Sequence, residues 1–232
     1  MKIKALILDA GGVMVKATHG AWNIPAKYRE ILGEYAREVG GEKWQAAHDK
    51  CVHIIREDIL MPGDTEHEYR LRREFFEAVA AEMGWQLTEA QLNDIAYDFT
   101  WNTGRYIWYD DVNPYLEKWG KDLKIGMLSD AMPSFRPFTE DHGSARFFDA
   151  IVLSTDIGAT KPSSKMYRTI CDRLGVKPEE CLFTDDREIN LRGAQKAGLH
   201  AVQMDREGDV SRWDGPVVRN FEELTAHMEE IN

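Results

Sequence analysis

The feature that most constrains the fold is a short apolar stretch near the N-terminus that ends in an aspartate. Residues Ala5 to Leu8 form an unbroken apolar run of strand length, typical of a parallel strand buried on both faces. Asp9 follows this run directly, and Gly11 and Gly12 come shortly after it. A carboxylate at the end of a buried strand, beside glycines that allow close backbone approach, stands where open α/β sheets bind ligands. An aspartate that merely ends a strand at a glycine-rich turn would look the same.

The composition is ordinary for a soluble globular protein with a sizeable core. Of the 232 residues, 43% are hydrophobic and 30% are charged. The net charge of −11 disfavours nucleic acid or an anionic membrane as a partner. Cys51, Cys171 and Cys181 form no CxxC pair, which predicts reduced thiols in a cytoplasmic protein. The N-terminal run is too short for a signal peptide, and no stretch approaches the length of a membrane span.

A helical pattern occupies the chain from about residue 21 to residue 103. Apolar residues recur there at helical spacing and predict four amphipathic helices packed as a small bundle. The first of them is expected to run on to Val39. Asp64 is expected to cap the third helix, and Thr88 with Gln91 to form a capping box on the fourth.

The pattern changes after residue 104, where strands alternate with helices. Four further strands are expected at 124–128, 150–153, 181–184 and 200–203, and residues 205–218 are expected to form a surface loop. This alternation predicts an α/β fold, a Rossmann-like doubly wound parallel sheet.

The two patterns together predict the domain organisation. Residues 1–16 and 105–232 would form the Rossmann-like core, and residues 17–104 a helical insert after the first strand.

Polar residues also follow three of the later strands. Ser129 ends the second strand, Lys161 lies in the loop after the third, and Asp185 and Asp186 end the fourth. All these ends share one edge of a parallel sheet, so the side chains can converge on Asp9. Such a cluster is costly for stability alone, but it suits phosphoryl transfer. Carboxylates hold Mg²⁺, lysine and serine bind phosphate oxygens, and a carboxylate can act as the nucleophile.

Four other residues near these segments receive structural interpretations. Asp130 is interpreted as an outward-facing or helix-capping residue. Trp22, Arg105 and Tyr106 flank the two chain crossings into the insert, where hinge packing is favoured over substrate contact.

Four segments resemble, in order, the motifs of the haloacid dehalogenase-like (HAD) hydrolase superfamily, which consists largely of phosphatases. They are Asp9-Ala-Gly-Gly-Val; Gly126-Met-Leu-Ser129-Asp; Gly158-Ala-Thr-Lys161-Pro162, with Tyr167 behind it; and Phe183-Thr-Asp185-Asp186-Arg, with Asn190, Ala194 and Gly198. The resemblance covers residues 1–16 and 105–205, and it places the insert where the family carries a helical cap domain.

The resemblance also implies roles for individual residues. Asp9 would be the catalytic nucleophile and a Mg²⁺ ligand, and Ser129 and Lys161 would bind the phosphoryl group. Asp186 would be the second carboxylate ligand of the metal. Asp185 would be a supporting ligand or a hydrogen-bond acceptor behind the metal, although it could also cap the helix that follows.

The sequence departs from the family pattern at Gly11. Phosphatases of the family usually carry an aspartate there, which protonates the leaving group; the backbone carbonyl of Gly11 could still coordinate Mg²⁺. A general acid contributes about 10²–10⁴ in rate, so its loss does not abolish the chemistry.

Three functions remain open. The favoured one is a Mg²⁺-dependent phosphatase of a small phosphorylated metabolite such as a sugar phosphate. The second is a weak or inactive relative that binds a phosphorylated ligand or a protein partner. The third is a 2-haloacid dehalogenase-like hydrolase, which the intact Asp185-Asp186 pair argues against. The amphipathic stripes fit a monomer and a homodimer alike.

Overall fold

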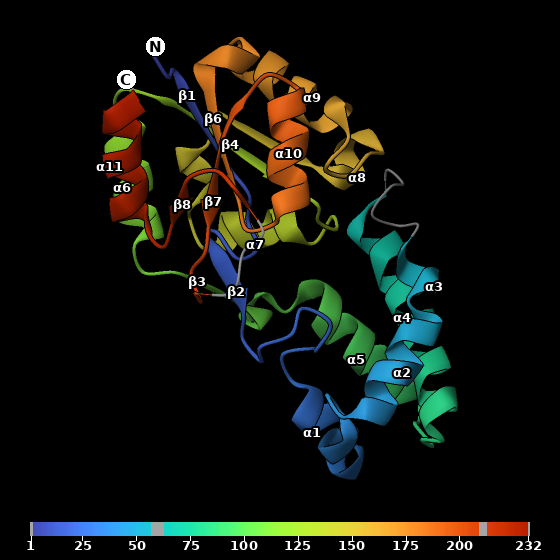
Figure 1. Ribbon diagram of the computed structural model, residues 1–232. Coiled ribbons are helices and arrows are strands. Elements are labelled where there is room, and N and C mark those ends of the chain that lie inside the picture. The colour runs from blue at the N-terminus through green and yellow to red at the C-terminus, as the bar shows by residue number, and fades with distance from the viewer. Residues whose placement is uncertain (1, 57–62, 209–212, 232) are drawn as a thin grey trace.

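A computed structural model describes residues 2–56, 63–208 and 213–231. The described residues form a six-stranded parallel sheet in the order β5-β4-β1-β6-β7-β8, together with a separate two-stranded antiparallel ribbon of β2 and β3 (Figure 1). The strands are β1 (Ala5–Leu8), β2 (Val15–Ala17), β3 (Tyr106–Trp108), β4 (Lys124–Ser129), β5 (Ala150–Leu153), β6 (Cys181–Asp185), β7 (His200–Met204) and β8 (Val217–Val218). The predicted α/β, Rossmann-like class is confirmed.

The helices also follow the predicted pattern closely. Around the sheet lie α6 (Val112–Trp119), α7 (Phe135–Asp141), α8 (Ser154–Ile157), α9 (Ser164–Leu174), α10 (Glu188–Lys196) and α11 (Phe221–Ile231). Between β2 and β3 lie α1 (Tyr28–Leu32), α2 (Glu42–Cys51), α3 (His53–Arg56), α4 (Thr65–Met83) and α5 (Glu89–Trp101). Short 3₁₀ turns include η1 (Gly33–Glu38), η3 (Thr103–Arg105), η4 (Ala145–Phe147) and η5 (Pro178–Glu180). None of the helices in the described part of the chain combines the length and the apolar character that a membrane-spanning helix needs.

Strand β1 lies in the middle of the sheet and is buried on both faces. Successive side chains point to opposite faces, so Leu6 and Leu8 pack in one hydrophobic cluster, whereas Ala5 and Ile7 pack in the other. Helices α6 and α11 cover the first face, and α9 and α10 cover the second. This double coverage is why the strand reads as a continuous apolar run.

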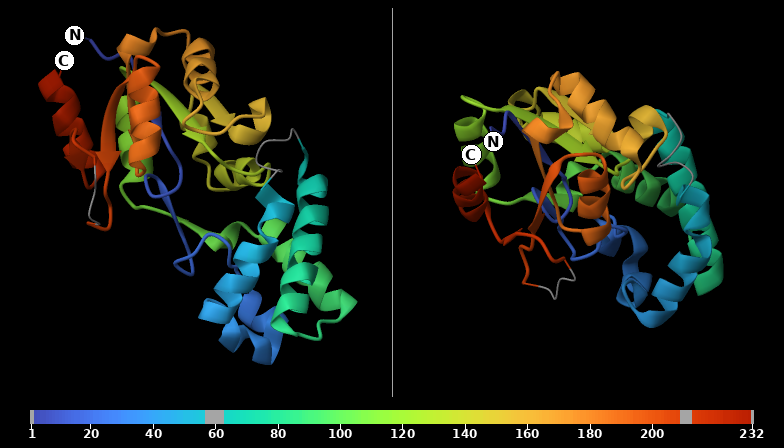
Figure 2. Two further views of the ribbon diagram at one scale, coloured as in Figure 1. Left: turned by 45° about the vertical axis from the view of Figure 1, so that its right-hand side comes forward. Right: turned by 45° about the horizontal axis from the view of Figure 1, so that its top comes forward.

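Helices α1 to α5 share a hydrophobic cluster of their own and lie beside the carboxyl edge of the sheet, as Figure 1 and the left view of Figure 2 show. Asp64 accepts a hydrogen bond from the backbone N–H of His67 at 2.8 Å and caps α4, as predicted. The predicted capping box of Thr88 and Gln91 opens α5. The boundary of residues 17–104 for a separate cap domain stays a prediction.

Two local expectations were wrong, and one element was not anticipated. The helix expected to reach Val39 is interrupted at Gly33, whose φ of 58° lies in the left-handed region, and it continues as the 3₁₀ turn η1. The loop expected after Asp205 contains β8, which pairs with β7 through Gln203 and Met204. The ribbon of β2 and β3 has strands of three residues, too short to show an alternating pattern.

Candidate active site

Three adjacent strands deliver the predicted polar residues to one edge of the sheet. Asp9 follows β1, Ser129 ends β4, and Asp185 ends β6, with Asp186 next to it. Since β1 pairs with both β4 and β6 in parallel, these ends lie side by side. Asp9, Ser129 and Asp186 line one pocket of about 370 Å³, together with Lys161. The sheet therefore brings the predicted residues together.

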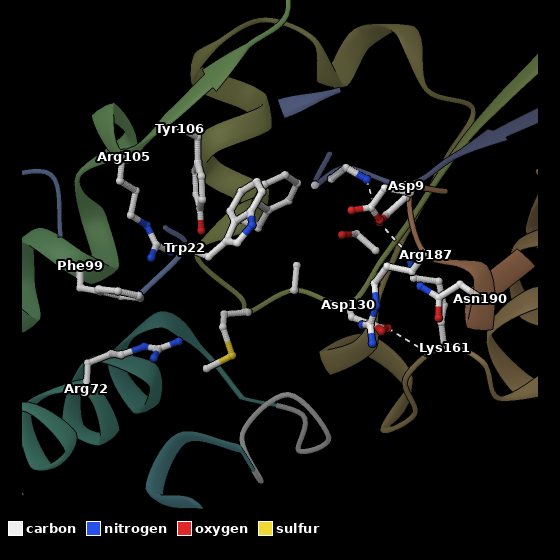
Figure 3. A pocket seen from close by; sticks show the side chains of 17 residues that line it. Asp9, Trp22, Arg72, Phe99, Arg105, Tyr106, Asp130, Lys161, Arg187 and Asn190 are labelled. Atoms are coloured by element: carbon white, nitrogen blue, oxygen red, sulfur yellow. Dashed lines mark hydrogen bonds and ion pairs between the residues drawn. The ribbon is translucent and has the colours of Figure 1, made fainter. Parts of the chain in front are cut away.

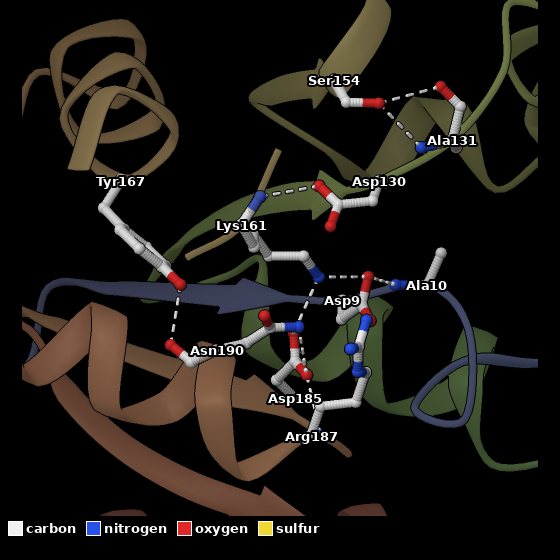
Figure 4. Close-up of polar contacts among 10 residues, drawn as sticks. All are labelled: Asp9, Ala10, Asp130, Ala131, Ser154, Lys161, Tyr167, Asp185, Arg187 and Asn190. Atoms are coloured by element: carbon white, nitrogen blue, oxygen red, sulfur yellow. Dashed lines mark hydrogen bonds and ion pairs between the residues drawn. The ribbon is translucent and has the colours of Figure 1, made fainter. Parts of the chain in front are cut away.

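Lys161 lies at the centre of the cluster and is almost completely buried. Its Nζ is 2.8 Å from Oδ1 of Asp9 and donates a hydrogen bond to Oδ2 of Asp185 at 2.7 Å (Figure 4). Asp130 holds the loop from the other side, because its Oδ1 accepts the backbone N–H of Lys161 at 2.9 Å. The interpretation of Asp130 as outward-facing was wrong: the residue is half-buried and lines the pocket.

Asp185 is fully buried and connects the cluster to α10. Its Oδ1 accepts the backbone N–H of Arg187 and the Nδ2 of Asn190, both at 2.9 Å. The hydroxyl of Tyr167 in turn donates to the backbone carbonyl of Asn190 at 2.7 Å. Asp185 thus contacts the start of α10 and also faces Lys161, and its role toward a metal stays a prediction.

The cluster carries more negative than positive charge, which perturbs its titration. Burial, reinforced by Asp185 and Asp186 and opposed by Lys161, raises the pKa of Asp9 from 3.8 to about 7. Loss of solvation and the neighbouring Asp185 raise the pKa of Asp186 to about 6. Burial opposes the charge of Lys161, but Asp185, Asp9 and Asp130 outweigh it and raise the pKa of the ammonium. A further cation would relieve the repulsion among these carboxylates.

The carboxylates are placed so that they could bind such a cation. One oxygen from each of Asp9, Asp185 and Asp186 lies within 4.8 Å of the others. Carboxylate oxygens are the ligands that hard divalent cations prefer. Asp185 already accepts hydrogen bonds from Lys161 and Asn190, so its oxygens are less available to a cation than those of Asp9 and Asp186.

The two glycines after Asp9 face different neighbours. Gly12 has a φ of +70°, and a Cβ there would stand 2.6 Å from Oδ2 of Asp186, so only glycine fits. A Cβ on Gly11 would stand 3.3 Å from the Trp22 indole ring, which is a contact at the end of a half-exposed side chain. Gly11 lines the pocket as predicted, and no side chain at this position can donate a proton.

The far wall of the pocket comes from the helical segment and its hinge. Trp22, Arg105 and Tyr106 line it, and Arg105 also packs on the rings of Phe99 and Tyr106, as the favoured hinge packing implies; substrate contact by these residues stays a prediction. Arg72 of α4 and Phe99 of α5 line it as well, opposite Asp9 and Lys161 (Figure 3). These last two residues were missed as pocket residues, because which face of the insert meets the core is decided by tertiary packing.

Comparison with known proteins agrees with this geometry. The model of the haloacid dehalogenase-like hydrolase family matches residues 3–198, and the chain belongs to this family. It is 35% identical over 124 residues to Phosphatase MT3486 of Mycobacterium tuberculosis. This aligned segment covers 52% of this chain and 56% of that protein. The chain thus spans about half the length of this curated relative.

Solved structures share the fold over almost the whole chain. A 2-haloacid dehalogenase from Pseudomonas syringae superposes with a TM-score of 0.70 at 20% identity, covering 99% of this chain and all of that one. A HAD phosphatase from Thermococcus onnurineus superposes with a TM-score of 0.65 at 22% identity, covering 97% and 98% of the two chains. At these identities the likeness shows the fold alone.

Proposed function

We propose that this protein is a Mg²⁺-dependent phosphatase that hydrolyses a small phosphomonoester through a phosphorylated Asp9. The observation that carries the proposal is the buried contact of Lys161 with both Asp9 and Asp185, of which Lys161 and Asp9 line the pocket. A buried ammonium between two carboxylates holds a nucleophile in place and offers positive charge to phosphoryl oxygens. The similarity to a curated phosphatase supports the same reaction class.

The two oxygens of Asp9 are not equivalent, which suggests which of them attacks. Oδ1 accepts the backbone N–H of Ala10 at 2.7 Å and faces Lys161 Nζ at 2.8 Å. Oδ2 is then the oxygen that forms the new bond to phosphorus, while the bond from phosphorus to the ester oxygen breaks. Water next attacks the acyl phosphate, which releases inorganic phosphate and restores the carboxylate. Ser129 and Lys161 would bind the other phosphoryl oxygens.

Asp9, Asp186 and Asp185, with the backbone carbonyl of Gly11, are the groups we propose to hold Mg²⁺. When bound, the ion would neutralise charge on the phosphoryl group and on the carboxylates around it. The carboxylates of Asp9 and Asp186, whose pKa values are raised by burial and further by the neighbouring Asp185, fit this role.

Gly11 limits the set of good substrates. Without an acid at this position, the departing alkoxide must take its proton from solvent, so esters of acidic alcohols should react fastest.

The test is hydrolysis of p-nitrophenyl phosphate, whose leaving group needs little protonation. We expect turnover with Mg²⁺, loss of turnover with EDTA, and none for Asp9→Asn, because an amide is not a competent nucleophile. A folded protein with no turnover would favour the inactive, ligand-binding alternative. Turnover of a 2-haloacid instead would identify the dehalogenase-like alternative.

A further inference from the structure

The wall of the pocket opposite Asp9 carries a buried positive charge that the proposed phosphoryl chemistry does not use. Arg105, in the turn η3, is only 5% exposed, and it lines the pocket. Within the described part of the chain no carboxylate lies within ion-pair distance of its guanidinium. Its Nη2 donates a long hydrogen bond to the Ser134 hydroxyl at 3.4 Å.

A second guanidinium is held beside the first. The Cζ atoms of Arg105 and Arg72 lie 3.9 Å and 4.2 Å from the centroid of the same Phe99 ring, which lies between them in Figure 3. The two positive centres are therefore no more than about 8 Å apart. Arg72 is also buried and lines the same pocket.

The nearest carboxylate to this pair is already engaged. Glu68 lies one turn before Arg72 on α4, at 4.0 Å, and is fully buried. Its Oε2 accepts the backbone N–H of Ser134 at 2.9 Å, and its Oε1 accepts the Ser134 hydroxyl at 2.8 Å. Glu68 thus connects α4 to the loop after β4 through its hydrogen bonds to Ser134. The positive charge of Arg105 faces the pocket.

We propose that Arg105, assisted by Arg72, binds a carboxylate on the substrate, so that the enzyme acts on small phosphomonoesters of hydroxy or amino acids. This inference rests on the proposed phosphatase function. A guanidinium that forms no ion pair within the described residues matches one carboxylate in charge, and its planar fork matches a carboxylate in shape. The pocket of about 370 Å³ is near the small end of ligand sites, which suits a metabolite of a few carbons. Asp9 and Arg105 at opposite walls would then orient the ester between them.

Two matched probes test the proposal. 3-Phosphoglycerate and glycerol 3-phosphate have the same carbon chain and differ by a carboxylate in place of a hydroxymethyl group. We expect the wild-type protein to prefer the carboxylate by kcat/KM. We expect Arg105→Gln to reduce that ratio about 10- to 100-fold, as loss of a charge-assisted hydrogen bond does. Arg105→Lys should retain part of it, because the charge remains and the fork is lost.

The control variant is Arg70→Gln. Arg70 lies on α4 two residues before Arg72 and is exposed, so the substitution makes the same charge change away from the pocket. The ratio should stay at the wild-type value in this variant. An unchanged ratio in Arg105→Gln, or no preference for the carboxylate in the wild type, would overturn the proposal. A stronger preference for propane-1,3-diol bisphosphate than for 3-phosphoglycerate would mean that the site binds a second phosphate instead of a carboxylate, and it would also overturn the proposal.

The outcome can be separated from that of the phosphatase proposal. If p-nitrophenyl phosphate is hydrolysed and the ratio shows no carboxylate preference, only the present inference fails. If nothing is hydrolysed, calorimetric binding of the same two probes decides it. Tighter binding of 3-phosphoglycerate, lost in Arg105→Gln and kept in Arg70→Gln, would support the carboxylate site, and equal binding would refute it.

Discussion

The raised pKa of Asp9 predicts that this carboxylate destabilises the metal-free protein at neutral pH. The pKa of Asp9 is about 7 in the folded protein, against 3.8 for an aspartate that nothing perturbs. Between these values the folded protein holds a proton that the unfolded chain releases, so stability falls as the pH rises through this window. This loss of stability is absent below pH 3.8 and complete above pH 7. Asp9→Asn, which mimics the protonated side chain, should escape it.

The size of the effect follows from the two pKa values. The protonation equilibria give a loss of about 2 kcal/mol at pH 5 and about 4 kcal/mol at pH 8. The stability advantage of Asp9→Asn over the wild type should therefore grow by about 2–3 kcal/mol between these pH values. Titrating groups distant from Asp9 are the same in both proteins and cancel in this difference, whereas Asp186, which interacts with Asp9 and titrates in the same range, adds to it.

Urea denaturation of both proteins in EDTA at pH 5 and pH 8 measures this difference. Saturating Mg²⁺ at pH 8 should shrink the advantage of Asp9→Asn, since the proposed ion offsets the repulsion that the carboxylate feels. An advantage that is the same at both pH values would refute the reasoning, because it would mean that burial and the neighbouring carboxylates do not raise the pKa of Asp9.

Three further predictions concern the same edge of the sheet. Mg²⁺ should raise Tm at pH 8 more than at pH 5, where protons compete for the carboxylates, and this rise in Tm should be lost in Asp186→Asn. An equal rise at both pH values would mean that the ion binds elsewhere. Gly11→Asp should raise turnover of alkyl phosphates, by up to about 10²-fold, once the half-exposed Trp22 ring moves aside. No gain in the double variant with Trp22→Ala would show that an acid at this position is not what limits the rate. Gly12→Ala should lower the free energy of unfolding by more than the matched Gly20→Ala. Both glycines have a positive φ, which costs an alanine about 1–2 kcal/mol at either position, but only the Cβ at position 12 meets Asp186. Equal losses by urea denaturation would contradict this.

The sheet and its polar edge could be predicted from the sequence because both follow from local patterns. An apolar run of strand length marks β1 and is followed by Asp9, and in β6 a shorter apolar run is followed by Thr184 and then Asp185. In a parallel sheet that position fixes the edge, so Asp9 and Asp185 must meet. Strand β8 escaped prediction because two residues carry no periodicity.

The opposite wall of the pocket could not be predicted in the same way. Nothing in local spacing says which face of the insert meets the core. A weak signal did exist on α4, where Glu68 and Arg72 extend the buried stripe of Phe75 and Val79 toward the N-terminus of the helix. Charged residues at core spacing, one turn apart, indicate a buried polar contact, and here that contact reaches Ser134.

The loop from Ser129 to Ser134 connects the two walls. At one end, Ser129 and Asp130 line the pocket, and Asp130 holds the backbone of Lys161. At the other end, Ser134 binds Glu68 through both its N–H and its hydroxyl. Since six residues span from the proposed phosphoryl site to the proposed cap, a shift of α4 would be transmitted to the loop that positions Lys161. This loop is therefore one direct connection between Lys161 and the helix that carries Arg72, so a substrate bound by both residues would depend on its conformation.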